Sequence, residues 1–338
     1  MNENMNQYIV EINKRIIASC NQKTSLDIET GKMGYCLYFF RLSRLLSEPE
    51  YKKQAEKLLD DIYMQLGAES TERTAYELAQ IGMGIDYLIK QKYLQGNINS
   101  VLEDIDKLIF KSVVFETKPV TYKMNGIIPV LYFICTRIGQ QHKGSDAGLM
   151  LEELCIKLIN GLYRSLDLDF YEESYLFNIL NYKLPQFLFV ASKIYSLQFY
   201  NYRIIEILKD ISNIILSRMP ALHFNRLYLL WSLVHLKEAT GWNIWDEQMN
   251  LLINHIDYQK IIYKELRNKD VFILDGVTGI YLLLSALKKT VYPISFEKTF
   301  FCRRIEESEI WKDEEALEFL GVINGFSGLI WVYYLIKL

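Results

Sequence analysis

The chain has 338 residues, of which 50% are hydrophobic and 23% are charged, and its formal net charge at pH 7 is -3. This composition allows a large buried core and excludes an intrinsically disordered chain. The small negative charge argues against nucleic-acid binding, which requires a basic surface.

The cysteine pattern indicates a reducing environment. Cys20, Cys36, Cys135, Cys155 and Cys302 are scattered, and no two of them form a Cys-x-x-Cys pair. An odd number of irregularly spaced thiols is typical of a reduced protein. The N-terminus lacks the apolar core of a signal peptide, and the longest apolar runs have about half of the roughly 20 residues that a transmembrane helix needs. We therefore expect a cytoplasmic protein without membrane insertion.

Amphipathic helices with one charged face recur along the chain. In residues 49–66, for example, Ala55, Leu58, Leu59 and Ile62 follow helical spacing, while Lys and Asp occupy the opposite face. The same pattern predicts half-exposed outer helices at 4–20, 49–66, 98–115, 147–165, 202–218, 244–264 and 295–310.

Segments that are apolar almost all round lie between these helices, and this predicts helices that are buried on most sides. Six such segments start at Thr30, Asn125, Asn181, Asn225, Asp275 and Asn324, and a weaker copy starts at Glu77. Thr, Asn and Asp favour helix N-caps, so we expect these side chains to cap the inner helices. Four copies have Gly directly after the cap, and three have a further Gly three residues later, at Gly34, Gly279 and Gly328.

This repeat of roughly fifty residues predicts one all-α domain over residues 1–338. Seven outer and seven inner helices would form an α/α toroid (barrel), with the N-terminal ends of the inner helices gathered at one end. An open helical solenoid is the alternative. Closure is favoured because the inner helices are too apolar to leave one side on solvent, and because the terminal copies lack a polar capping helix.

The glycine-rich phrases resemble those of the lanthionine synthetase C family. They are GKMG (31–34), IGMGIDYLI (81–89), DGVTGIYLLL (275–284) and NGFSGLIWV (324–332), and the similarity extends from Gly31 to Leu338. The resemblance implies an α/α toroid that holds one zinc at its centre through two Cys and one His. In such enzymes the metal activates a substrate thiolate, which adds to a dehydrated Ser or Thr to close a thioether ring.

The sequence departs from the family pattern at the metal ligands. Phe224 and Leu274 stand where the two Cys are expected, Asp275 stands at the His position, and Asn181 replaces a further expected His. We therefore expect no metal and no cofactor. The interpretation is a non-zinc, degenerate member that acts in the maturation or binding of a ribosomally synthesised peptide. Its expected partners are a precursor peptide and a biosynthetic enzyme, and whether it catalyses a reaction stays open.

The convergent end is the predicted binding site. Helix N-termini carry about half a positive charge each and offer free N–H groups, which favours an anionic or carbonyl-rich ligand. Asp275 is either a ligand or acid/base group or a plain N-cap. The other candidate binding residues are donors and apolar contacts at the mouth, namely Asn125, Asn181, His223, Phe224, Tyr228 and Asn324.

Two other functions are compatible with the sequence. The segment 167–174 gathers Asp167, Asp169, Glu172 and Glu173, and a carboxylate pair at the mouth of an α/α ring would suit a glycan-acting hydrolase. A solvated acidic loop explains the same residues. The remaining alternative is a non-catalytic interaction scaffold.

Overall fold

The computed structural model describes residues 3–20, 22–68, 73–115, 120–124 and 126–338. Within these ranges the chain is helical and forms no strand, apart from one isolated bridge between Leu320 and Gly325. The prediction of an all-α protein is confirmed. No helix in the described part of the chain has the length and apolar character needed to cross a membrane.

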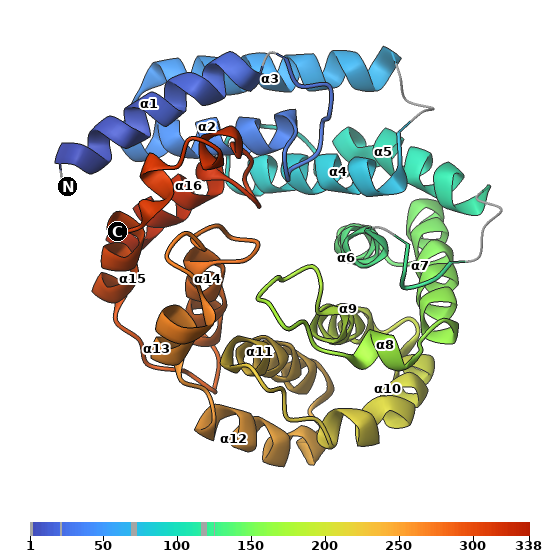
Figure 1. The fold of residues 1–338 in the computed structure, drawn as a ribbon. Coiled ribbons are helices and arrows are strands. Elements are labelled where there is room, and N and C mark those ends of the chain that lie inside the picture. The colour runs from blue at the N-terminus through green and yellow to red at the C-terminus, as the bar shows by residue number, and fades with distance from the viewer. Residues whose placement is uncertain (1–2, 21, 69–72, 116–119, 125) are drawn as a thin grey trace.

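An inner layer of helices forms a closed cycle of contacts. Among the described helices, each member packs against the next, and the last packs against the first. Figure 1 shows this ring, with the first and last helices of the chain side by side. In order, the inner helices are α2 (Lys32–Leu46), α4 (Ala75–Lys90), α6 (Ile127–Ile138), α9 (Lys183–Leu197), α11 (His223–Thr240), α14 (Val277–Leu287) and α16 (Phe326–Lys337).

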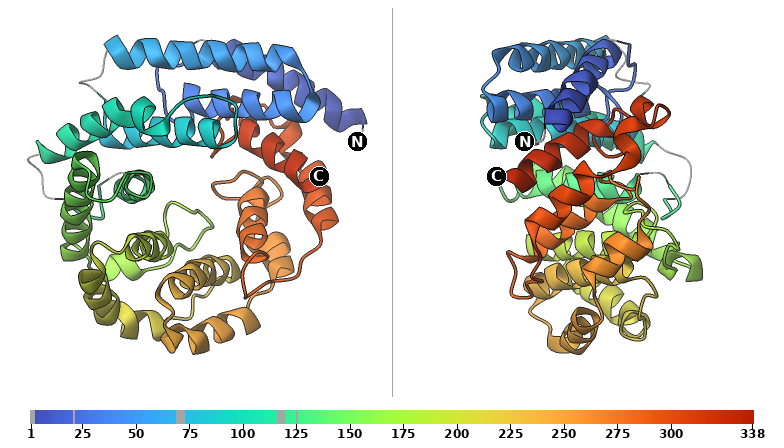
Figure 2. Two further views of the ribbon diagram at one scale, coloured as in Figure 1. Left: turned by 180° about the vertical axis from the view of Figure 1, so that it is seen from behind. Right: turned by 60° about the vertical axis from the view of Figure 1, so that its left-hand side comes forward.

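Amphipathic helices surround this ring (Figure 2). In α3 the predicted apolar stripe of Ala55, Leu58, Leu59 and Ile62 is buried, while the opposite face is exposed. Burial of such a stripe against the inner layer is what holds each outer helix in place. The outer helices are α1 (Glu3–Cys20), α3 (Pro49–Ala68), α5 (Ile98–Val114), α7 (Asp146–Arg164), α10 (Asn201–Leu216), α12 (Asp246–Asn254) and α15 (Lys298–Glu306).

The predicted outer helix 244–264 is not continuous. It consists of α12, a break at residues 255–257, the short helix α13 (Tyr258–Lys260) and a π-helical turn, Ile261–Glu265. The break has a local cause, because the Asp257 side chain accepts hydrogen bonds from the backbone N–H groups of Gln259 and Lys260 at 3.0 and 3.1 Å. Asp257 therefore starts a new helix where the sequence predicted a continuing one.

Candidate functional site

Three loops that precede inner helices share one backbone arrangement. They span residues 25–34, 270–279 and 319–328, and in each the first helical N–H donates to the carbonyl seven residues earlier. These bonds run from Lys32 to Ser25 at 3.0 Å, from Val277 to Asp270 at 3.1 Å and from Phe326 to Phe319 at 2.9 Å. The second glycine of each phrase packs directly on the carbonyl six residues upstream. The repeated spacing of glycines therefore reflects close contact between loop and helix.

The loops also bond to one another, which places their helices at one end of the ring. Val322 N–H donates to the Glu29 carbonyl at 3.0 Å, and Leu274 N–H donates to Ile323 at 2.9 Å. The loop before α9 joins this set through Ile179 N–H, which donates to the Leu274 carbonyl at 3.0 Å. That loop projects toward the centre of the ring (Figures 1 and 2). The predicted gathering of inner-helix N-termini is thus confirmed for α2, α9, α14 and α16.

The predicted capping role of Thr30, Asp275 and Asn324 is wrong. The N-caps are the following glycines, at positions 31, 276 and 325, and none of these three helix starts has a side-chain cap. Side-chain caps are unnecessary there because loop carbonyls already accept from the first N–H groups. The same bonds occupy donors that the sequence predicted to be free at the starts of α2, α14 and α16.

Two further predicted caps, Asn181 and Asn225, do not cap their helices. Asn181 is exposed in the turn before α9, whose N-cap is Tyr182. Asn225 is not a cap but a fully buried residue inside α11, where its amide donates to Glu173 at 2.7 Å and to the Ser174 carbonyl at 2.8 Å. Asn125 lies outside the described residues.

A residue distant in sequence, Glu265, caps the start of α11. Backbone N–H groups of His223 and Phe224 donate to the Glu265 carboxylate at 2.7 and 3.1 Å. The His223 ring bonds through Nδ1 with the backbone N–H of Asp257 at 3.2 Å, so it supports the junction between α12 and α13. Phe224 is buried against Phe177, with ring centroids 4.7 Å apart. Neither side chain forms part of a polar mouth.

The positions expected to hold zinc do not fit that metal. Phe224 packs on another phenylalanine, and Leu274 contributes backbone bonds to the loop network. Asp275 is half-buried, and its pKa is raised by burial and by the nearby Asp270 charge. Among the described residues no group of three or more His, Cys, Asp or Glu side chains is arranged to hold a metal ion.

We expect purified protein to contain much less than one zinc per chain, because Phe224 and Leu274 offer no ligand atom and Asp275 offers a single carboxylate. Elemental analysis after dialysis against a mild chelator measures this. Retention of stoichiometric zinc would contradict the expectation.

The acidic segment 167–174 has structural contacts. Asp167 caps the short helix α8 (Leu168–Tyr171), bonds to the Tyr122 hydroxyl and pairs with Lys123 at 3.1 Å. Glu173 accepts from the backbone of Ala221 and from Asn225. These carboxylates tie separate segments together, and none of their contacts favours glycoside hydrolysis.

An aromatic cavity lies inside the ring, between α4, α6, α9 and α11. Its volume is 190 Å³, and half-buried rings of Tyr132, Phe189 and Trp231 line it together with Tyr228. Phe189 lies 4.5 Å from Trp231 and 5.7 Å from Tyr132, centroid to centroid. The Tyr228 hydroxyl donates to the Ile179 carbonyl at 3.3 Å, which ties the cavity wall to the loop before α9. Tyr228 is therefore the predicted candidate that does line a cavity.

A larger cavity, lined by both polar and apolar side chains, adjoins it. Its volume is 720 Å³, and it shares Met83 and Tyr132 with the aromatic cavity. Its wall includes Asp86, Gln140 and Lys193. Lys193 lies 5.1 Å over the Phe189 ring. His235 stacks edge-on to Phe189 and Trp231, and burial lowers its pKa, a shift that Glu238 opposes.

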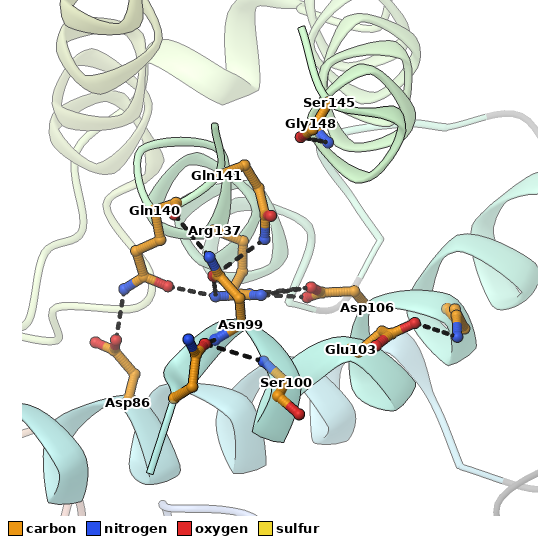
Figure 3. A network of polar contacts seen from close by, with 12 residues as sticks. Asp86, Asn99, Ser100, Glu103, Asp106, Arg137, Gln140, Gln141, Ser145 and Gly148 are labelled. Atoms are coloured by element: carbon orange, nitrogen blue, oxygen red, sulfur yellow. Dashed lines mark hydrogen bonds and ion pairs between the residues drawn. The ribbon is translucent and has the colours of Figure 1, made fainter. Parts of the chain in front are cut away.

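A buried polar network positions this wall (Figure 3). Arg137 is fully buried and binds both carboxylate oxygens of Asp106, at 2.8 to 3.1 Å. It also donates to Asn99 at 3.0 Å and to Gln140, which in turn donates to Asp86 at 2.6 Å. Asp86 also pairs with Lys90 at 2.7 Å. The network therefore fixes two cavity-lining side chains from behind.

Sequence reasoning missed Phe189, Trp231, His235 and Lys193. Their signal was present as a stripe at spacings of three and four residues, with Tyr228, Trp231 and His235 on one face of α11. It was hidden because the inner helices are apolar on every side. Of the tyrosines on inner helices, Tyr132 and Tyr228 line the cavity, whereas Tyr38 and Tyr333 are core residues.

Neither a family model nor a curated protein matches the chain. The resemblance drawn from the glycine phrases therefore remains a prediction.

Proposed function

We propose that this chain is a lanthionine synthetase C-like α/α toroid of seven inner and seven outer helices that lacks zinc chemistry and binds a peptide. The peptide would be a ribosomally synthesised precursor in the cytoplasm, where the five free thiols stay reduced. The closed cycle of inner helices and the glycine loops gathered at one end support the toroid.

The aromatic cavity, together with the larger cavity beside it, is the observation that carries the proposal. Half-buried rings of Phe189, Trp231 and Tyr132 offer apolar area for a side chain of the peptide. Asp86, Gln140 and Lys193 offer hydrogen-bonding groups for its backbone. A volume of 720 Å³ falls in the range of about 300–1,000 Å³ that is common for ligand pockets, and a few apolar walls with placed polar groups are typical of them.

We expect Phe189→Ala and Trp231→Ala each to weaken peptide binding by roughly tenfold, since a lost aromatic contact costs about 1–2 kcal/mol. The peptide is selected from a phage-displayed random library on the immobilised full-length protein, and its affinity is then measured by calorimetry. Circular dichroism checks the fold of each variant.

Tyr202→Ala is the matched control, because Tyr202 is 66% exposed on the outer helix α10. It should leave the affinity unchanged. Equal affinity for wild type and folded Trp231→Ala would place the site elsewhere. Failure of the library to yield any binder would contradict a peptide ligand and leave the interaction scaffold as the better interpretation.

A further inference from the structure

A recess separate from the central cavities lies at the rim of the ring. Its volume is 520 Å³, and the loop before α2 and the first turn of α4 enclose it. Asp27, Glu29 and Glu77 line this acidic recess. Glu77 pairs with Arg73 at 2.8 Å, whereas Asp27 and Glu29 have no cationic partner among the described residues. The recess therefore has an excess of negative charge.

The carboxylates are held in place by short-range bonds. Asp27 accepts from the backbone N–H groups of Thr30 and Gly31 at 2.7 and 3.0 Å and from the Ser25 hydroxyl. Glu29 accepts the Tyr76 hydroxyl at Oε1, and within the described part of the chain its Oε2 has no partner. Burial and the charges of Glu29 and Asp27 raise the pKa of Tyr76, so this hydroxyl stays a neutral donor.

Gln80 adds a donor of fixed orientation to the same recess. Gln80 is 4% exposed, and its Oε1 accepts the backbone N–H of Ile28 at 2.8 Å. That bond assigns the amide nitrogen to the other position, where Nε2 has no acceptor among the described residues. A buried N–H without an acceptor is unfavourable, so a ligand oxygen placed there gains a hydrogen bond.

We infer that the acidic recess binds the amino terminus of a peptide. The α-ammonium group would lie against the Glu29 and Asp27 carboxylates, and the carbonyl of the same residue would accept from Gln80 Nε2. A lone metal cation or a lysine side chain satisfies the charge but brings no adjacent carbonyl. This inference rests on residues outside the central cavities, so it does not depend on the proposed function.

The test uses ¹⁵N-labelled full-length protein and follows the side-chain amide signals of Gln80 by NMR. These signals are assigned by their disappearance in Gln80→Met. Triglycine amide should shift them in a saturable way, and N-acetyl triglycine amide should bind roughly tenfold more weakly because it has no charge. Equal binding of the acetylated peptide, or unmoved Gln80 signals with triglycine amide, would overturn the inference.

Two variants test the negative charge of Glu29 and the hydrogen-bond donor of Gln80 separately. Glu29→Gln keeps an acceptor for Tyr76 but removes one charge, and it should weaken triglycine amide by about fivefold. Gln80→Glu keeps an acceptor for Ile28 and replaces the donor, so it should weaken triglycine amide yet strengthen methylamine. Glu50→Gln on α3 is the control and should change neither. If methylamine binds wild type as tightly as triglycine amide, the recess is a general cation site and the inference is wrong.

Discussion

Replacing Arg137 with methionine is expected to lower the free energy of unfolding by about 3–5 kcal/mol, because it leaves the Asp106 carboxylate buried without its partner. Arg137 is fully buried and Asp106 is 4% exposed. The guanidinium makes a bidentate contact with Asp106 and bonds to Asn99 at 3.0 Å and to Gln140. Urea denaturation measures the change at neutral pH.

The loss should become smaller as the pH falls. Burial raises the pKa of Asp106 above its usual 3.8 in the native protein, although the Arg137 guanidinium lowers it. Without Arg137 the folded-state pKa rises further. A carboxyl group whose pKa is higher in the folded than in the unfolded chain binds its proton more tightly when folded. The loss of stability caused by Arg137→Met is therefore largest above the folded-state pKa of Asp106. It disappears as the pH falls toward 3.8, the usual pKa of this carboxyl group.

Two control variants test whether the unpaired Asp106 carboxylate causes the loss of stability. The double variant Arg137→Met, Asp106→Leu removes both charges and should recover most of the stability, because apolar replacement of a buried pair is often neutral. Lys107→Met removes an ion pair between two exposed side chains, Lys107 and Glu103, and should change the free energy of unfolding little. A double variant as unstable as Arg137→Met would show that the loss comes from packing.

The helical repeat could be predicted from the sequence because it depends on local patterns. Apolar spacing placed the inner and outer helices, and most boundaries differ from the predicted ones by one to three residues. Five inner helices begin two residues after the expected cap, as α2 does after Thr30 and α14 after Asp275. In α2, α14 and α16 the offset arises because a glycine and loop carbonyls, not side-chain caps, complete the helix start.

The candidate site was harder to predict because it depends on contacts between distant segments. A buried Asn225 that holds Glu173, or a Glu265 that caps α11 from another helix, leaves no local signature. The bonding of the helix starts was missed for the same reason. At α2, α14 and α16 the first N–H groups, which the sequence predicted to be free, donate to loop carbonyls. Tyr228, a candidate within the described residues, lines the aromatic cavity.

Gly328→Ala is expected to destabilise the protein by about 3 kcal/mol or more, because a Cβ at this position would overlap the backbone carbonyl of Val322. The carbonyl cannot simply move away. Val322 N–H is bonded to Glu29, and the next carbonyl, of Ile323, accepts from Leu274. Relief of the overlap must therefore break contacts between the loops or displace α16.

Gly67→Ala provides a matched glycine-to-alanine change in a helix. Gly67 lies in α3, where an added Cβ meets nothing within 4 Å. Alanine has the higher helix propensity, so this variant should gain about 0.5–1 kcal/mol. If urea denaturation shows that Gly328→Ala lowers the free energy of unfolding while Gly67→Ala raises it, the loss comes from the loop contact and not from helix propensity.

Amide hydrogen exchange adds a second measurement. Gly328→Ala should speed exchange at Val322 and Leu274, two residues that bond neighbouring loops together. Unchanged stability and unchanged exchange would mean that the glycine phrases are not needed for close packing of loop on helix.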